Sequence, residues 1–231
     1  MSDPVFLRDG ARPAVRVERR YDHPIEAVWR AVTSPEGLAA WFPAPVRFAG
    51  DVADFGDSTG QVLTMEPPRR LVFTWGGDQL EFSLREDGAG TVFVLTHSFD
   101  DRAGAASFAS GWEHCLQVLG LVLAGAPLPE PERFEARHEE LVRAFGLEDP
   151  VVIRGDAGWS VRIERQLVVP AAVAWDRLRA GSLDVPNVLV KLGDGTGHGA
   201  RLVVAVNGSD EAELEPATAW VRAAVARAAT G

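Results

Sequence analysis

The feature that most constrains the fold is a long apolar stretch from Ala103 to Leu123, which follows a series of alternating segments. Large apolar side chains recur in it at steps of three and four, which predicts a helix with one hydrophobic face. These side chains are Phe108, Trp112, Cys115, Leu116, Leu119 and Val122. The only partner of comparable apolar area is the run from about Val46 to Ser98, which alternates like an antiparallel sheet. A long helix laid across a curved sheet leaves a wedge-shaped gap, and such gaps are common small-molecule sites.

Four of the strands in that run are predicted at residues 61–65, 71–75, 80–85 and 91–98, because turn residues separate them. In the last three strands one parity is bulkier and more aromatic, and we assign it to the side that faces the helix. It consists of Leu71, Phe73, Trp75, Leu80, Phe82, Leu84, Phe93, Leu95 and His97.

The beginning of the chain predicts one strand and two short helices. Residues 1–13 lack periodicity and are predicted to be a flexible arm, whereas residues 14–21 alternate as a half-exposed strand, with Val15, Val17 and Arg19 on one side. Proline suits the first turn of a helix, so the first helix is expected over residues 24–33. A serine cap starts a second helix at residue 34.

An internal repeat links the two ends of the chain. Residues 161–178 restate residues 15–32 without a gap, so the opening strand and helix occur twice. The second copy continues only with a hairpin and a final helix that begins near Pro216. The predicted division is therefore a flexible arm at 1–13, a complete domain at 14–126, a linker helix at 127–158 and a reduced repeat at 159–231.

Composition excludes several classes of function. A formal net charge of -10, with no basic stripe, argues against partners such as nucleic acids and anionic membranes. No long apolar run or leader peptide is visible, so a cytoplasmic location is expected. The single cysteine, Cys115, excludes an internal disulfide. Lys191 is the only lysine among many arginines, which favours a bacterial, GC-rich origin.

The order and spacing of several landmarks over residues 14–125 resemble the SRPBCC, or START-like, superfamily, and within it the C-terminal domain of the heat shock protein 90 ATPase activator. The landmarks are Val17-Glu18-Arg19 before Pro24, Ile25, Val28 and Trp29; Thr33-Ser34-Pro35-Glu36-Gly37-Leu38 before Trp41-Phe42; Glu66-Pro67-Pro68-Arg69-Arg70-Leu71-Val72-Phe73-Thr74-Trp75; Gly90-Thr91 through Leu95-Thr96-His97; and Gly111-Trp112 before Leu116 and Leu119.

This resemblance implies an α+β helix-grip fold, in which six or seven antiparallel strands wrap a long helix around a hydrophobic cavity. Relatives include carriers of hydrophobic ligands, aromatic polyketide cyclases and the eukaryotic cochaperone. One scaffold that hosts unrelated activities implies little about the activity of this chain.

The predicted cavity has an aromatic lining with one histidine. Any one of these residues is more simply explained as core, but a group of aromatic walls with few polar atoms is typical of a ligand pocket. The predicted lining is Trp41, Phe48, Phe73, Trp75, Phe82, Phe93, Leu95, His97, Phe108, Trp112 and Leu119.

No residue pattern predicts a metal site or a cofactor, because the five histidines lack ligand spacing: His23, His97, His114, His138 and His198. His114 and Cys115 are neighbours on a helix and point apart, which denies them a nucleophile-base contact.

Three functions remain open from the sequence. The leading one is a non-enzymatic protein that binds a hydrophobic small molecule, with His97 fixing a polar end of the ligand. The second is a cyclase-like enzyme in which His97, with Glu81 or Glu113 if the fold brings either inward, transfers a proton. The third is an interaction or stress-response protein that uses the C-terminal repeat to form a homodimer or to bind a protein partner.

Overall fold

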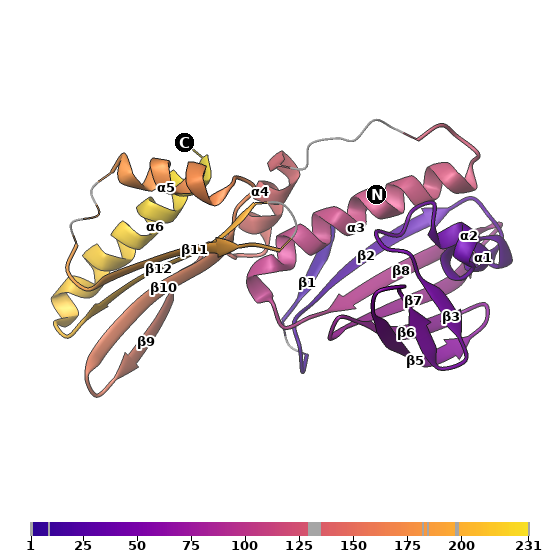
Figure 1. Ribbon diagram of the computed structural model, residues 1–231, viewed down its shortest axis with the longest axis horizontal. Coiled ribbons are helices and arrows are strands. Elements are labelled where there is room, and N and C mark those ends of the chain that lie inside the picture. The colour runs from indigo at the N-terminus through magenta and orange to yellow at the C-terminus, as the bar shows by residue number, and fades with distance from the viewer. Residues whose placement is uncertain are drawn as a thin grey trace. The chain divides into compact units, whose positions relative to one another are not determined.

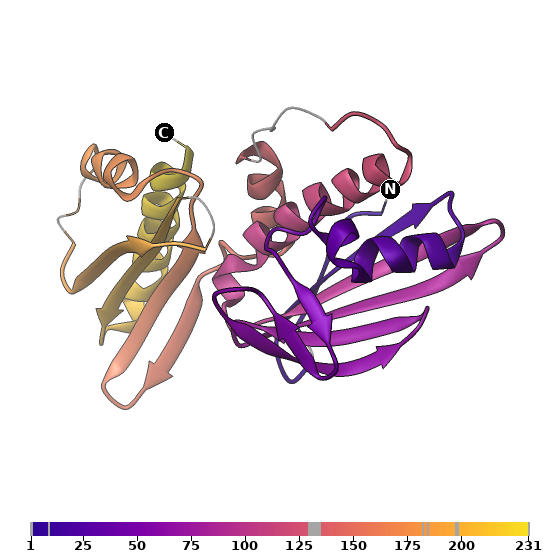
Figure 2. The ribbon, with the colours of Figure 1, turned by 45° about the vertical axis from the view of Figure 1, so that its right-hand side comes forward.

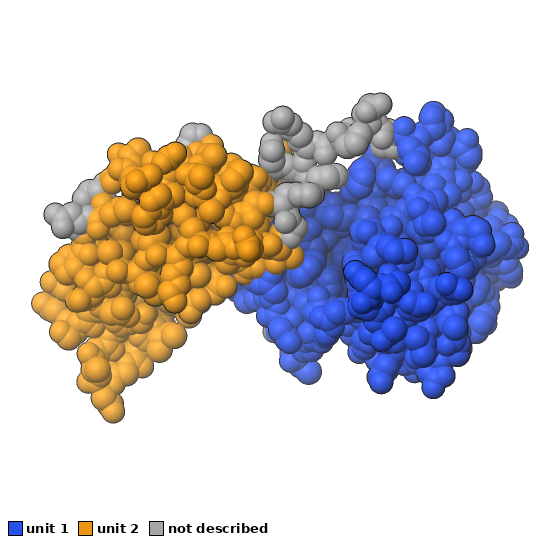
Figure 3. Space-filling view, in the orientation of Figure 1, with its two compact units in different colours: residues 1–133 blue, residues 134–231 orange. Residues whose placement is uncertain are grey.

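The protein is described by a computed structural model over residues 2–8, 10–128, 135–181, 183, 185–196 and 199–230. The chain divides into two compact units, residues 1–133 and residues 134–231 (Figures 1 and 3). None of the helices in these ranges is long and apolar enough to cross a bilayer.

Unit 1 is an antiparallel sheet with a long helix across one face. Its described residues form eight strands in the order β1-β2-β8-β7-β6-β5-β4-β3. Helix α3 packs mainly on β2, and α1 lies over β7 and β8 (Figure 2). The elements are β1 (Val5–Leu7), β2 (Ala14–Tyr21), α1 (Ile25–Thr33), α2 (Pro35–Leu38), β3 (Arg47–Ala49), β4 (Val52–Asp54), β5 (Thr59–Glu66), β6 (Arg70–Trp75), β7 (Asp78–Asp87), β8 (Gly90–Ser98) and α3 (Ala105–Leu123). The predicted α+β helix-grip fold is confirmed.

Local signals in the sequence account for these elements. Pro24 precedes α1 in an extended conformation, and the Ser34 hydroxyl accepts a hydrogen bond from Gly37 N and so caps α2. Side chains of the predicted helix-facing parity in β6, β7 and β8 are buried, with the exception of Trp75, which is half-buried. The parity prediction is therefore confirmed by burial.

One strand differs from the prediction. The expected flexible arm contains β1, which pairs with β2 through Val5↔Arg16 and Leu7↔Ala14 and gives the sheet eight strands rather than six or seven. Three residues are too few to show a period in the sequence. Pairing with an existing strand supplies the backbone hydrogen bonds that make so short a strand stable.

Unit 2 is a smaller sheet covered by two helices. Its described strands lie in the order β11-β12-β10-β9, with α6 packed on β10 and β12 and α5 packed against α6 and β11. The elements are α4 (Glu135–Ala144), β9 (Val151–Gly155), β10 (Gly158–Gln166), α5 (Ala171–Arg179), β11 (Val188–Asp194), β12 (Ala200–Gly208) and α6 (Leu214–Thr230).

The predicted linker helix over residues 127–158 is only partly helical. Helix α4 covers residues 135–144, and residues 129–134 lie outside the described residues. Residues 151–155 form β9, which pairs with β10. The apolar Val151-Val152-Ile153 run is too short to distinguish a strand from a linker until its partner strand is known.

The strand order β9-β10-β12-β11 in unit 2 matches β1-β2-β8-β7 in unit 1. The registers match as well, so β9 takes the place of β1, a correspondence that the sequence analysis did not reach. The equivalent pairs are Phe6↔Val15 and Val15↔His97 in unit 1, and Val152↔Val161 and Val161↔Val206 in unit 2. Unit 2 has no counterpart of β3 to β6 among its described residues.

Candidate functional site

The aromatic side chains predicted to line a cavity form a cluster on the helix-facing side of unit 1. The ring of Phe82 lies 5.3 Å from that of Phe73, 5.4 Å from that of Phe93 and 5.9 Å from that of Trp41, centroid to centroid. The contacts of Phe82 with Phe73 and Phe93 are edge-to-face, and its contact with Trp41 is tilted. The four side chains are buried, so they fill space between the sheet and the helices and hold one another in place.

Two aromatic residues that the sequence analysis missed extend the cluster. The ring centroid of Phe42 lies 5.6 Å from that of Trp112 and 5.5 Å from that of Trp75. Phe55 stacks on Trp75 with centroids 5.4 Å apart. Both lie outside the predicted strands, where alternation does not indicate which way a side chain points.

The remaining predicted lining residues differ in exposure. Leu95 and Leu119 are fully buried and His97 is nearly so, whereas Phe48, Trp75 and Phe108 keep part of their surface exposed. Phe48 contacts Phe73 at a centroid distance of 5.0 Å. Ligand contact by the predicted lining residues stays a prediction.

His97 is held from both sides by hydrogen bonds. Trp112 Nε1 donates to His97 Nδ1 at 3.1 Å, and His97 Nε2 lies 3.0 Å from Asp78 Oδ2. Because Nδ1 accepts, the network assigns the hydrogen to Nε2, which donates to the carboxylate. Arg12 Nη2 donates to the other oxygen of Asp78 at 3.3 Å. The four side chains form the chain Arg12–Asp78–His97–Trp112.

This arrangement does not resemble an acid-base site. Burial lowers the pKa of His97 despite the opposing effect of Asp78, which favours the neutral ring. Both ring nitrogens are occupied, so neither is free for a substrate. The predicted partners lie elsewhere, since Glu81 accepts from Arg70 at 2.9 Å and Glu113 accepts from Arg19 at 3.2 Å.

Asp78 is the carboxylate that the sequence analysis missed. It begins β7 directly after the Gly76-Gly77 turn, and no local pattern connects it with His97. The connection depends on the register of β7 against β8, in which Leu80 pairs with His97.

The described residues contain no group of three His, Cys, Asp or Glu side chains that could hold a metal ion, and His198 lies outside them. Burial raises the pKa of Cys115 to about 11, so its thiol stays protonated at neutral pH.

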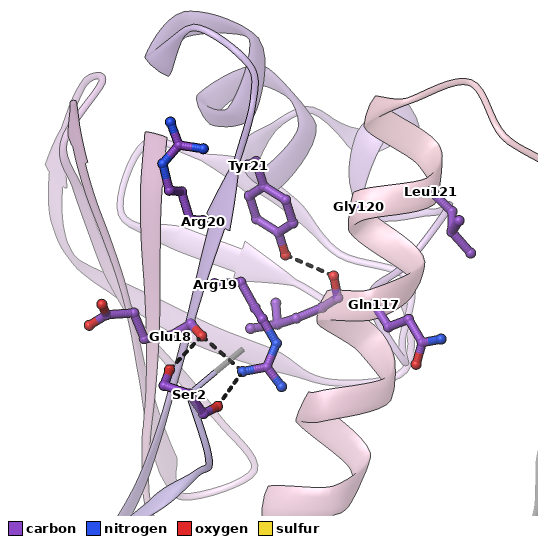
Figure 4. A pocket seen from close by; sticks show the side chains of 9 residues that line it. Ser2, Glu18, Arg19, Arg20, Tyr21, Gln117, Gly120 and Leu121 are labelled. Carbon is purple, nitrogen blue, oxygen red and sulfur yellow. Dashed lines mark hydrogen bonds between the residues drawn. The ribbon is translucent and has the colours of Figure 1, made fainter. Parts of the chain in front are cut away.

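A groove lies between β2 of the sheet and the long helix α3 (Figure 4). Its volume of about 580 Å³ is in the range of small-molecule sites. It is lined by Ser2, Glu18, Arg19, Arg20, Tyr21, Leu116, Gln117, Gly120 and Leu121. None of these belongs to the predicted lining, because α3 crosses the sheet nearer β2 than the aromatic strands.

Two side chains of β2 shape the groove. The Tyr21 hydroxyl donates to the Leu116 carbonyl at 2.8 Å and ties the strand to α3. The Arg19 side chain is 8% exposed and donates to Glu113 on α3 at 3.2 Å. The sequence already indicated that Arg19 is buried, since this arginine shares the apolar side of its strand with Val15 and Val17.

Comparisons with known proteins match part of the chain. Residues 22–124 match the family described as activator of Hsp90 ATPase homolog 1-like protein. EF2215 of Enterococcus faecalis, a conserved protein of unknown function, is 19% identical with a TM-score of 0.55, over 62% of this chain and 90% of that chain. Among curated proteins, none matches this sequence.

Two further structures have lower TM-scores. CalU16 of Micromonospora echinospora is 27% identical with a TM-score of 0.49, over 62% of this chain and 92% of that chain. Protein MLL2253 of Mesorhizobium loti is also 27% identical, with a TM-score of 0.43, over 50% of this chain and 99% of that chain.

Proposed function

Because residues 22–124 form a domain of the activator of Hsp90 ATPase homolog 1-like family, we propose that unit 1 binds a hydrophobic small molecule between its sheet and α3. The observation that carries the proposal is the groove of about 580 Å³ between β2 and α3. Leu116, Leu121 and the ring of Tyr21 offer it an apolar lining. As expected from the sequence, we place this binding protein in the cytoplasm of a bacterium.

Native mass spectrometry of the purified full chain, followed by organic extraction, tests the proposal. We expect an apolar compound bound to each chain, and replacing Gly120 by Leu should remove it by filling the groove. Gly111→Leu is the matched control, because it changes the same residue type on the same helix where a Cβ meets no atom within 4 Å. A chain that stays empty after exposure to a panel of hydrophobic compounds would contradict the proposal.

The same measurement locates the ligand. Trp75→Ala and Phe108→Ala alter partly exposed members of the predicted aromatic lining and leave the groove unchanged. If these variants lose the ligand and Gly120→Leu retains it, the ligand lies on the aromatic wall. The reverse result places it between β2 and α3. The cyclase alternative has no such support, since both nitrogens of His97 are occupied.

A second proposed function is self-association of unit 2 through β9. This strand lies at the edge of its sheet, with Val151 53% exposed and Ile153 61% exposed. An exposed apolar edge is a template for pairing, and two copies of β9 can pair antiparallel about a twofold axis. Sedimentation equilibrium should show a dimer that Ile153→Lys dissociates and Val173→Lys, on the exposed side of α5, does not. A monomer at all concentrations would contradict it.

A further inference from the structure

The guanidinium of Arg19 is buried in unit 1, and its Nε donates to none of the described residues. Nη1 donates to the carbonyl oxygens of Ser2 and Glu18, each at 2.8 Å, and Nη2 donates to Glu113. Nε is buried without an acceptor among the described residues. A buried donor that lacks a partner is costly, so an acceptor placed there is favoured. Arg19 lies beside the groove, at the end lined by Ser2 and Glu18 (Figure 4).

Unit 2 shows which groups an arginine at this position binds. Arg165 follows Val161 as Arg19 follows Val15, and it is 2% exposed. Its Nη2 donates to Glu139 on α4, and its Nη1 lies 3.5 Å from Glu148 Oε2. Its Nε donates to the Gln166 carbonyl oxygen at 3.4 Å, so the guanidinium of Arg165 contacts two carboxylates and one carbonyl oxygen of the chain. In unit 1 the Nη1 position is occupied by the neutral carbonyl oxygens, so Arg19 is paired with one carboxylate where Arg165 has two.

The groove next to Arg19 is open because α3 carries a glycine at that point. A Cβ on Gly120 would lie 3.3 Å from the Tyr21 ring. The same place in α6, counted from the start of each helix, is Ala229, whose side chain is buried. The glycine thus leaves room for an occupant that unit 2 does not admit at this position.

We propose that the groove binds a carboxylic acid with an apolar tail. The carboxylate pairs with the guanidinium of Arg19, and the tail lies along Leu116, Gly120 and Leu121. The ion pair of Arg19 with Glu113 does not exclude a second carboxylate, because the equivalent Arg165 contacts two. This inference rests on the proposed function of unit 1 and names the class of its ligand.

Titration calorimetry of the full chain with dodecanoate and dodecan-1-ol tests the ligand class at about pH 8, where the acid is ionised. We expect one dodecanoate per chain and affinity for the alcohol lower by about tenfold or more, since a charge-assisted hydrogen bond is lost. Arg19→Gln should weaken dodecanoate binding by about tenfold or more and leave the alcohol unchanged. The matched control is Arg16→Gln, on the exposed side of β2, which removes the same charge without effect.

The outcomes separate the two proposals. Equal affinity for the acid and the alcohol, or an unchanged Arg19→Gln variant, overturns the carboxylate assignment and leaves hydrophobic binding intact. Binding of neither compound, together with an empty chain in native mass spectrometry, overturns both. If Arg19→Gln fails to fold, Gly120→Leu replaces it, since it should abolish binding of both compounds while Gly111→Leu retains binding. Binding of dodecanoate that persists in Gly120→Leu would place the acid elsewhere and overturn the proposal.

Discussion

In both units a long helix packs on strands of the same order. The units differ in the side chains that fill the space between that helix and its own sheet. The helix-facing side of the sheet in unit 1 carries aromatic side chains and a histidine. The buried core of unit 2 is aliphatic except for Trp159. At equivalent positions unit 1 has Phe93, Leu95, His97, Trp112 and Gly120, and unit 2 has Leu202, Val204, Val206, Val221 and Ala229. The same strand order is therefore compatible with an aromatic or an aliphatic inner face.

One charged position is retained in both units and is used differently. Arg19 and Arg165 are both buried on the inner face of their sheets. Arg165 is enclosed by carboxylates from α4 and the segment after it, while Arg19 faces an open groove. Glu113 pairs with Arg19 as Glu139 pairs with Arg165, and the second carboxylate that Glu148 provides to Arg165 is the one that we propose a ligand provides to Arg19.

The largest effect is expected from Trp112→Ala compared with Val221→Ala. Trp112 contacts Phe42 and donates to His97, so its removal should cost unit 1 about 3–5 kcal/mol. The smaller Val221 side chain should cost unit 2 less, about 2 kcal/mol. Scanning calorimetry of the full chain should show a different transition lowered in each variant. An unchanged melting profile for Trp112→Ala would contradict its central position.

The second-largest loss of stability is expected when Arg19 or Arg165 is replaced by glutamine. Arg165→Gln leaves Glu139 without its cation and should destabilise unit 2 by about 3 kcal/mol. Arg19→Gln should cost unit 1 less, about 1–2 kcal/mol, because its Nε is already unsatisfied. Urea unfolding followed by hydrogen exchange separates the units. Equal losses would show that the two arginines are equally well paired, contrary to the comparison.

The pH dependence of unit 1 should be smaller still and specific to His97. Burial lowers the pKa of His97 in the folded protein, so the unfolded chain takes up the proton first. This contribution to stability is complete above about pH 6.5 and is lost as the pH falls towards the folded pKa. His97→Gln, whose amide can accept from Trp112 and donate to Asp78, should flatten the dependence of the melting temperature on pH below 6.5. A wild-type slope retained in this variant would assign the effect to another group.

The smallest effects concern the glycines of α3. Gly111→Ala should stabilise unit 1 by about 1 kcal/mol, because alanine is the better helix former and no atom obstructs it. At Gly120 the same gain should be offset by the contact with Tyr21. Melting temperatures of the two variants measure the difference. A rise of equal size at both positions would show that Tyr21 yields at no cost, and the groove would then tolerate a side chain as unit 2 does.

Much of the fold could be predicted from local patterns. Periods of two and of about 3.6 located the strands around Phe73, Phe82 and Phe93 and the helix around Trp112, because burial on one face imposes those periods directly on the sequence. Proline and serine marked the starts of α1 and α2. The short edge strands β1 and β9 were not predicted, because three to five residues are too few to show an alternation of apolar and polar side chains.

The candidate site was less predictable. Sequence patterns identified most members of the aromatic cluster, whose rings contact one another. That these residues contact a ligand stays a prediction. Phe42 and Phe55 were missed because they lie in irregular segments. His97 was found, yet its occupied nitrogens remove the acid-base role considered for it.

The sequence by itself determined the elements, their buried faces and the restatement of the first strand and helix, because each of these depends on neighbours along the chain. Only the tertiary structure decided that Asp78 meets His97, that α3 crosses beside β2, and that Arg19 faces a groove while Arg165 faces Glu139. These contacts join residues far apart in sequence. Strand register and the line on which a helix crosses its sheet set them, and neither quantity is expressed in any local period.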